Sequence, residues 1–318
     1  MTKHSAGPLL AKVKRLEDQI RSVFVGGESA VDSLLIGFLS GLHVLIEDIP
    51  GVGKTTLAKT LAASAALDYA RIQFTPDLLP GDVIGMTVYS LEKREFLFKP
   101  GMIMHQFLLA DEINRASART QSALLEAMQE HAVSVDGVTY PLPEPFFVIA
   151  TQNPSAFTGT FPLPEAQVDR FGVSFSLGYP SESDEHDILL RFQKDELIPA
   201  LTPVITPADV GEARRIVREM HVEPVIRHYV TALARHTRTS PRIRLGMSPR
   251  ASLHLLLAGQ TAAFLAGRDF VAPEDIALAA PVVIPHRLQL RSEARLENMT
   301  PEKITAEILS AVKMPAGW

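Results

Sequence analysis

Residues 48–55, which read DIPGVGKT, constrain the fold of this chain more than any other segment. They follow the compact apolar run 42–47 and lead into a helical pattern, rich in Ala, Leu and Lys, over about residues 53–66. A strand that passes through a Gly-rich turn into a helix is the setting of the Walker A phosphate-binding motif. The sequence therefore predicts a P-loop.

Each part of this turn suits a phosphate chain. Gly51 and Gly53 allow backbone N–H groups to close around phosphate oxygens, and the helix N-terminus adds the positive end of its dipole. Lys54 supplies a mobile positive charge for the β- and γ-phosphates, and the Thr55 hydroxyl can bind Mg²⁺. We therefore predict that ATP contacts the turn and the start of the helix, at Gly51, Val52, Gly53, Lys54, Thr55 and Thr56.

One position departs from the motif, because Asp48 stands where the strict pattern has its first Gly. Asp tolerates unusual backbone angles better than most residues, so we expect the turn to survive this change. The alternative interpretation is a Gly-rich strand-to-helix turn that binds nothing. The flanking strand and helix, and two further motifs, argue against that alternative.

An acidic pair follows the apolar run 106–110. An apolar strand that ends in Asp-Glu, here Asp111 and Glu112, is the Walker B arrangement. Asp111 would hold Mg²⁺ through its water shell, because Mg²⁺ dehydrates reluctantly. Glu112 would polarise the attacking water. Asp-Glu after an apolar run is common, so this assignment depends on the P-loop beside it.

Asn153 follows another apolar run, residues 146–151. In an open α/β sheet, ligands bind at the carboxyl edge of the strands, where Asn153 could hydrogen-bond the γ-phosphate or the attacking water. Asn-Pro is also a frequent turn dipeptide, so alone it indicates only the end of a strand. In third place after two nucleotide motifs, it favours the functional interpretation.

The wider pattern predicts an α/β core. Two stretches, 80–101 and 133–140, interrupt the alternation of strands and helices and are typical of β-hairpin insertions, the second around the turn dipeptide Asp136-Gly137. Near-continuous apolar runs are what a parallel sheet covered on both faces requires. They occur at residues 42–47, 69–74, 106–110, 146–151 and 173–177.

After residue 180 helical patterns follow one another. Four of them begin with a Pro at the position of a first helical residue: Pro207, Pro249, Pro273 and Pro301. We therefore predict two domains, an α/β nucleotide-binding core with N-terminal helices over residues 1–180 and an all-α domain over residues 181–318.

Composition narrows the classes of partner. The net charge of −5, without a long basic run, argues against a general nucleic-acid-binding protein. The absence of cysteine excludes disulfides, thiolate zinc sites and thiol nucleophiles. There is no apolar signal-peptide core near the start and no run of eighteen apolar residues. We expect a cytoplasmic protein without a membrane span.

The order of motifs resembles the MoxR group of AAA+ ATPases over nearly the whole chain. The resemblance implies an AAA+ core with a helix-2 insert near residues 80–101, followed by an all-α lid. The strings that carry it are the P-loop, QFTPDLLPGD (73–82), ADEINRA (110–116), VDGVTYPLPEPFF (135–147), ATQNP (150–154), GTFPLPEAQVDRF (159–171) and MSPRASLHL (247–255).

The resemblance also implies roles for single residues. Arg170 occupies the arginine-finger position and would reach a neighbouring subunit's γ-phosphate, and Arg250 resembles the sensor-2 arginine of the lid. Val25 and Gly26 resemble the segment that lines the adenine pocket. Ordinary surface positions are the alternative for both arginines, although a cation in the first turn of a helix is unfavourable by dipole, which hints at a use for Arg250.

Two arginines near the acidic pair, Arg115 and Arg119, are reserve candidates for the finger. Residues 155–158 (Ser-Ala-Phe-Thr) depart from the family pattern, which has acidic residues there. That difference leaves the phosphate chemistry untouched but concerns any partner or subunit contact made by that loop.

The leading hypothesis is an oligomeric, Mg²⁺-dependent ATPase that remodels a protein client, and the resemblance implies a hexamer. The resemblance suggests chaperone-like maturation of protein complexes beside a partner with a von Willebrand factor A domain. Three alternatives stay open: a DNA-associated AAA+ motor, a small-molecule P-loop kinase, and a nucleotide-gated scaffold without turnover. The intact set of Lys54, Thr55, Asp111 and Glu112 weighs against the scaffold.

Overall fold

A five-stranded parallel sheet forms the centre of the computed structural model, which describes residues 6–153, 160–193 and 201–315. Its order is β2-β5-β8-β1-β9, with every neighbouring pair parallel, so the carboxyl ends of all five strands meet at one edge. This confirms the predicted parallel α/β sheet. The strands are β1 (Val44–Glu47), β2 (Tyr69–Gln73), β5 (Phe107–Asp111), β8 (Phe147–Gln152) and β9 (Val173–Phe175).

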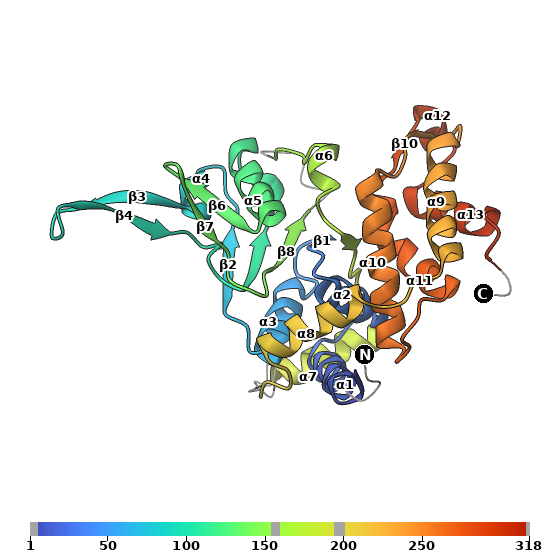
Figure 1. The fold of residues 1–318 in the computed structure, drawn as a ribbon, viewed down its shortest axis with the longest axis horizontal. Helices are drawn as coiled ribbons and strands as arrows, with labels where there is room; N and C mark the ends of the chain where they lie inside the picture. Colours follow the sequence, from blue (N-terminus) through green and yellow to red (C-terminus); the bar gives the residue numbers. More distant parts are fainter. Residues whose placement is uncertain (1–5, 154–159, 194–200, 316–318) are drawn as a thin grey trace.

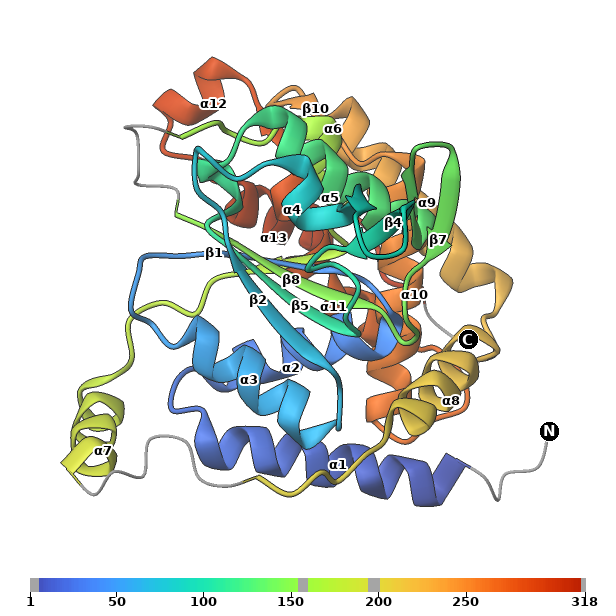
Figure 2. The same cartoon turned by 90° about the vertical axis from the view of Figure 1, so that its left-hand side faces the viewer.

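Helices cover both faces of this sheet, which is why its strands are apolar throughout. Along β5, Phe107 and Leu109 face one apolar cluster and Leu108 and Ala110 face the other. Figure 2 shows the two layers. On one side lie α1 (Ala6–Val23), α2 (Glu28–Ser40) and α3 (Lys54–Ser64), and on the other α4 (Pro80–Ile84) and α5 (Ala118–Glu130).

Both predicted insertions are antiparallel hairpins. The first pairs β3 (Gly85–Ser90) with β4 (Glu95–Pro100) and projects away from the body of the molecule (Figure 1). The second pairs β6 (Ala132–Val135) with β7 (Val138–Pro141). Stacked rings of Phe98 and Tyr140, with centroids 3.9 Å apart, join the two hairpins. The short helix α4 before the first hairpin was not predicted.

The second half of the chain is helical, with one short addition. The four predicted prolines are the first residues of α8, α10, α11 and α13, and the side chains of Thr206, Ser248 and Thr300 cap three of these helices. A two-stranded pair, β10 (Ile243–Leu245) with β11 (Gln289–Leu290), supplements the helices. The helices are α7 (Glu182–Gln193), α8 (Pro207–Arg218), α9 (Pro224–Thr239), α10 (Pro249–Leu265), α11 (Pro273–Val283), α12 (Ser292–Leu296) and α13 (Pro301–Ala311).

The boundary between core and lid near residue 180 stays a proposal. Helix α8 lies beyond it in sequence but packs on α2, where Arg214 Nε donates to the carbonyl of Phe38 at 3.1 Å. One apolar cluster also extends from α1 and the sheet into the lid helices. The two parts therefore share a core. Among the described residues, no helix combines the length and apolar character needed to cross a membrane.

Asp48 connects the end of β1 to the end of its neighbour β9. Its carboxylate accepts hydrogen bonds from the backbone N–H groups of Leu177 (2.6 Å) and Gly178 (2.8 Å), from Ser176 Oγ (2.9 Å) and from its neighbour Ile49 (2.8 Å). Asp48 is not among the residues with positive φ. It therefore replaces Gly through hydrogen bonding and not, as expected from the sequence, through tolerance of an unusual backbone angle.

These hydrogen bonds also set the protonation of Asp48. Burial alone would raise the pKa of its carboxyl, but the donors from Gly178, Ser176, Ile49 and Leu177 outweigh burial and lower it below the ordinary value of 3.8. A carboxyl whose pKa is depressed on folding stabilises the protein above the unfolded-state pKa. That stabilisation is lost as the pH falls through the folded-state pKa.

We predict that Asp48→Asn lowers the free energy of unfolding by about 1–3 kcal/mol at pH 7, because hydrogen bonds to a charged acceptor are lost. The gap between wild type and variant should narrow as the pH falls from about 4, the unfolded-state pKa, through the lower folded-state pKa, because the wild-type carboxyl then becomes protonated. Urea unfolding at pH 7 and at a series of pH values below about 4 measures both effects. Asp136→Asn, at an exposed hairpin turn, is the matched control. Equal stability of Asp48→Asn and wild type at pH 7 would contradict the assigned role.

Candidate functional site

A polar cavity of about 370 Å³ opens at the carboxyl edge of the sheet. Because β1, β2, β5 and β8 all end there, residues far apart in sequence line one space. The lining brings together most of the predicted nucleotide residues. The residues are Pro50, Gly51, Gly53, Lys54, Thr55, Arg71, Gln73, Asp111, Glu112 and Asn153. Val52 and Thr56 belong to the same turn and helix but do not line the cavity.

The P-loop turn requires glycine at two positions. Gly51 and Gly53 have φ angles of 87° and 91°, in the left-handed region that residues with a Cβ rarely adopt. Lys54 is the first residue of α3, and its Nζ donates to the backbone carbonyl of Asp48 at 2.8 Å. Burial lowers the pKa of Lys54, while the charges of Asp48, Asp111 and Glu112 oppose this shift. The lysine is thus held at the cavity wall, close to the acidic pair.

Thr151 of β8 holds both members of the acidic pair. Its hydroxyl donates to Asp111 Oδ1 at 2.6 Å and accepts from the backbone N–H of Glu112 at 2.9 Å. Glu112 itself has a φ of 55°, a left-handed conformation that is uncommon outside glycine and concentrated at functional sites. Its carboxylate pairs with Arg115 at 3.0 Å. Arg115, a reserve finger candidate, is thus engaged within its own subunit, whereas Arg119 is exposed on α5.

Two cavity residues on β2 were missed by the sequence analysis. Arg71 Nη2 donates to Asp111 Oδ2 at 2.6 Å, and Gln73 is the last residue of β2. The predicted strand at residues 69–74 contained the signal that would have found them. Parallel strands end at one edge, and the rule applied to Asn153 also places polar residues at the end of β2 near the ligand.

Asn153 lines the phosphate cavity and Phe24 contacts the P-loop, whereas the adenine-pocket role of Val25 and Gly26 stays a prediction. The backbone carbonyl of Asn153 accepts from Asn114 Nδ2 at 3.3 Å, which connects the end of β8 with the turn after β5. Phe24, directly before Val25 and Gly26, packs close enough to Gly53 that a Cβ there would lie 3.2 Å from the ring. The atypical residues 155–158 lie outside the described residues.

Arg170 and Arg250 line a second cavity, of about 250 Å³, together with Arg218. This cavity shares no lining residue with the phosphate cavity. Arg250 Nη2 donates to Gln129 Oε1 at 3.3 Å. Within the described part of the chain, the guanidinium of Arg170 has no hydrogen bond or ion pair, and it is half-buried. Neither arginine is therefore placed at its own subunit's phosphate cavity.

The second cavity owes its charge to these arginines, because its buried histidines stay neutral. Burial lowers the pKa of His254 to about 3, assisted by the neighbouring charges of Arg287 and Arg250. Burial likewise lowers the pKa of His43 to about 3, against an opposing hydrogen bond with the carbonyl of Met128. A cavity lined by three arginine cations and by the neutral imidazoles of His43 and His254 is suited to binding an anion.

Comparison with known proteins agrees with this geometry. Residues 43–173 match the family described as "ATPase family associated with various cellular activities (AAA)", and residues 235–308 match the AAA lid domain. A protein of Bacillus subtilis, YeaC, is 47% identical over 97% of this chain and 95% of its own length. Chaperone MoxR1 of Mycobacterium tuberculosis is 39% identical over 98% of this chain and 87% of its own.

A solved structure of a Cytophaga hutchinsonii protein assigned as an ATPase superposes with a TM-score of 0.90. It is 38% identical, and the match covers 98% of this chain and 97% of that one. Relatives of this similarity and coverage share the core, the lid and the order of the two. The chain belongs to the MoxR family of AAA+ ATPases.

Proposed function

We propose that this ATPase acts as an oligomer in which the phosphate cavity of one subunit receives Arg170 and Arg250 of its neighbour. The observation that carries the proposal is the separation of the two sites within one chain. The cavity with Lys54 and Glu112 and the cavity with the arginines have no residue in common. A second subunit is the simplest way to join them. A hexameric ring is the arrangement that the family resemblance suggests.

The phosphate cavity suits ATP with Mg²⁺. Thr55 and Asp111 line it together, and one carboxylate with one hydroxyl is a typical protein contribution to Mg²⁺, whose other ligands are phosphate oxygens and water. Among the described residues there is no cluster of three or more metal-binding side chains that would indicate a dedicated metal cage. Thr55 and Asp111 would hold the ion, and Mg²⁺ would there offset the negative charge of the phosphates.

The protein's own groups then divide the work of hydrolysis. Backbone N–H groups around Gly51 and Gly53 hold the phosphates, and Lys54 places a positive charge beside them. Glu112, fixed through its backbone by Thr151, orients the attacking water and accepts its proton. Arg71 adds a second cation to the same wall.

A finger from the neighbour completes the site. An arginine supplied in trans neutralises charge that spreads over the transferring phosphoryl group, and such a group accelerates hydrolysis by about 10³–10⁵-fold. Arg170 is suited to this role because it has no ion-pair partner among the described residues of its own chain. Hydrolysis would then depend on assembly.

The projecting β3–β4 hairpin supports a protein client. Around its turn, Leu91 is 85% exposed and Phe96 is 73% exposed. The four charged residues between them, Glu92, Lys93, Arg94 and Glu95, sum to zero. An exposed apolar tip without net positive charge fits an unfolded or loosely folded polypeptide better than the phosphate backbone of DNA. The name of the relative Chaperone MoxR1 agrees with this role.

The family resemblance further leads us to propose a cytoplasmic location and a partner with a von Willebrand factor A domain, which would supply client recognition. Co-purification of the native protein with its bound proteins tests this part. Salt-dependent binding to DNA would instead revive the motor alternative.

We predict that Lys54→Ala abolishes ATP binding, whereas Glu112→Gln binds ATP but hydrolyses it about 10²-fold or more slowly, because the variant lacks a proton acceptor. Nucleotide binding by calorimetry and phosphate release at saturating ATP separate the two effects. Unchanged turnover in Glu112→Gln would show that another group activates the water.

We predict that Arg170→Ala keeps its affinity for ATP and loses about 10³-fold in turnover. Mixing it with Lys54→Ala should partly restore hydrolysis, because a Lys54→Ala subunit still offers a finger to its neighbour. Specific activity of the wild type should also fall on dilution. A rate that is independent of concentration, with no rescue at any mixing ratio, would favour a monomeric kinase-like enzyme.

We predict that the double variant Leu91→Ser with Phe96→Ser keeps its ATPase rate but loses client capture when combined with the slow-hydrolysing Glu112→Gln. The matched control is Leu253→Ser, which removes a leucine that is similarly exposed, on the lid helix α10. The proteins retained from cell extract in the presence of ATP are compared between the hairpin variant and the Leu253→Ser control, each combined with Glu112→Gln. Equal capture would exclude the hairpin as the client contact.

A further inference from the structure

We infer that Asp169 and Arg287 are positioning residues, which hold Arg170 and Arg250 together as one unit across the junction of core and lid. This inference rests on the proposed function, in which those two arginines act on the neighbour's nucleotide. A polar network around the buried Arg287, which contacts no substrate itself, then determines where the two arginines lie.

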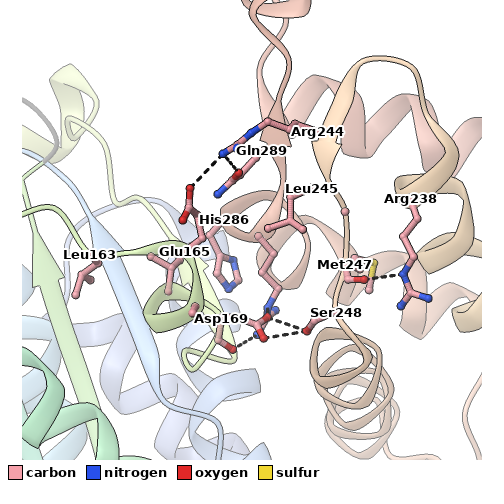
Figure 3. Close-up of a pocket in the computed structure, with 14 residues that line it drawn as sticks. Leu163, Glu165, Asp169, Arg238, Arg244, Leu245, Met247, Ser248, His286 and Gln289 are labelled. Atoms are coloured by element: carbon pink, nitrogen blue, oxygen red, sulfur yellow. Dashed lines mark hydrogen bonds and ion pairs between the residues drawn. The ribbon is translucent and has the colours of Figure 1, made fainter.

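Asp169 is the first part of the network. It directly precedes Arg170 and is the C-terminal cap of the short helix α6 (Glu165–Val168). Its carboxylate accepts from Ser248 Oγ, at 3.1 Å and 2.9 Å to its two oxygens, and from Arg287 Nε at 2.9 Å. Figure 3 shows Asp169 and Ser248 facing each other across the junction. One core carboxylate thus binds two lid segments.

Arg287 forms hydrogen bonds to the backbone on both sides of Arg170. Its side chain is only 2% exposed. Besides the carboxylate, its guanidinium donates to the carbonyls of Asp169 (3.5 Å), Phe171 and Gly172 (3.3 Å). The residue before Arg170 and the two residues after it are therefore held by one side chain of the lid.

The same network sets the position of Arg250. Ser248 is the N-cap of α10 and also accepts from the backbone N–H of Ala251 at 3.0 Å, so the hydroxyl that binds Asp169 belongs to the first turn that carries Arg250. One turn further along α10, His254 Nδ1 accepts from Arg287 Nη2 at 2.7 Å. His254 and Arg250 both line the second cavity. The network therefore reaches both arginines.

Polar contacts, and not apolar packing, fix this part of the junction. A cavity of about 630 Å³ lies beside the network, between α6 and the lid, lined in part by Leu163, Leu245 and His286 (Figure 3). Within the described part of the chain, one further ion pair spans this cavity, between Arg244 and Glu165 at 3.3 Å, and it is largely exposed and contributes little. If the lid shifted slightly and left Arg287 buried, the guanidinium would lose its acceptors, which is costly for a charge out of water.

Accurate placement matters because displacement of a catalytic group by about 1 Å can cost about 10²-fold in rate. Ser248→Gly removes the hydroxyl that binds Asp169 with little loss of helix capping, since Gly is an acceptable N-cap. Asp169→Asn removes the charge that faces Arg287. Ser248→Thr keeps the hydroxyl and is the conservative control.

The expected result is that Ser248→Gly and Asp169→Asn bind ATP as the wild type does, lose about ten- to a hundredfold in turnover, and regain part of it when mixed with Lys54→Ala. Ser248→Thr should keep at least half of the wild-type rate. The rescue is the decisive measurement. A Lys54→Ala subunit can restore turnover in a variant subunit only by supplying the arginine pair, so rescue shows that the arginine pair was what the variant oligomer lacked. Melting temperature and oligomer size are recorded for every variant.

Three outcomes would overturn the inference. Full turnover in both Ser248→Gly and Asp169→Asn, with turnover lost in Arg170→Ala, would leave the proposed function standing and remove this one. Lost turnover without rescue, in oligomers of normal size, would mean that the network only stabilises the fold. Full turnover in Arg170→Ala itself would refute the proposed site shared between subunits. The inference about Asp169 and Arg287 would then fail as well, because it rests on that site. Ser248→Gly keeps the test decisive if Asp169→Asn does not fold.

Discussion

The hydrogen bonds to the Asp48 carboxylate are the constraint on which the nucleotide site depends. The P-loop needs glycines in left-handed conformations, and glycines have no side chains that could anchor the turn. Asp48 supplies the anchor from its first position, by binding backbone donors at the end of β9. Since β1 lies between β8 and β9, this one side chain links the turn and the end of β1 to the end of β9, where the chain leaves the sheet for the lid.

The distribution of charge makes the single chain chemically incomplete. Lys54 and Arg71 share the phosphate cavity with two carboxylates, so much of its positive charge is already offset before a triphosphate arrives. Among the described residues, the lining of the second cavity contains three arginines, the neutral histidines His43 and His254, and no acidic residue. The phosphate cavity needs additional positive charge when the phosphoryl group is transferred, and the arginine cavity holds cations without an anion. This complementarity is the electrostatic basis of the proposed assembly.

Polar networks occur at the two places where single side chains must be positioned accurately, the acidic pair and the arginine pair. Thr151 bridges Asp111 and the strained backbone of Glu112, and Asp169 bridges Ser248 and Arg287. Apolar packing tolerates small slips of one element against another, whereas buried hydrogen bonds and ion pairs lose most of their energy when geometry changes. The protein therefore uses apolar clusters to stack its layers and polar networks to place individual groups.

The amino-acid sequence alone was sufficient for the parallel sheet, the two hairpins, the proline-started helices and the residues of the phosphate cavity that end β1, β5 and β8. These features are local: each follows from a period, a turn dipeptide or a motif within a few residues. Arg71, the anchoring of Asp48, the αL backbone of Glu112 and the grouping of Arg170 with Arg250 were decided only by tertiary structure. Each of these features depends on partners between about 40 and 130 residues away in the sequence. Strand order and helix packing determine which of these distant residues meet, and no local sequence pattern contains that information.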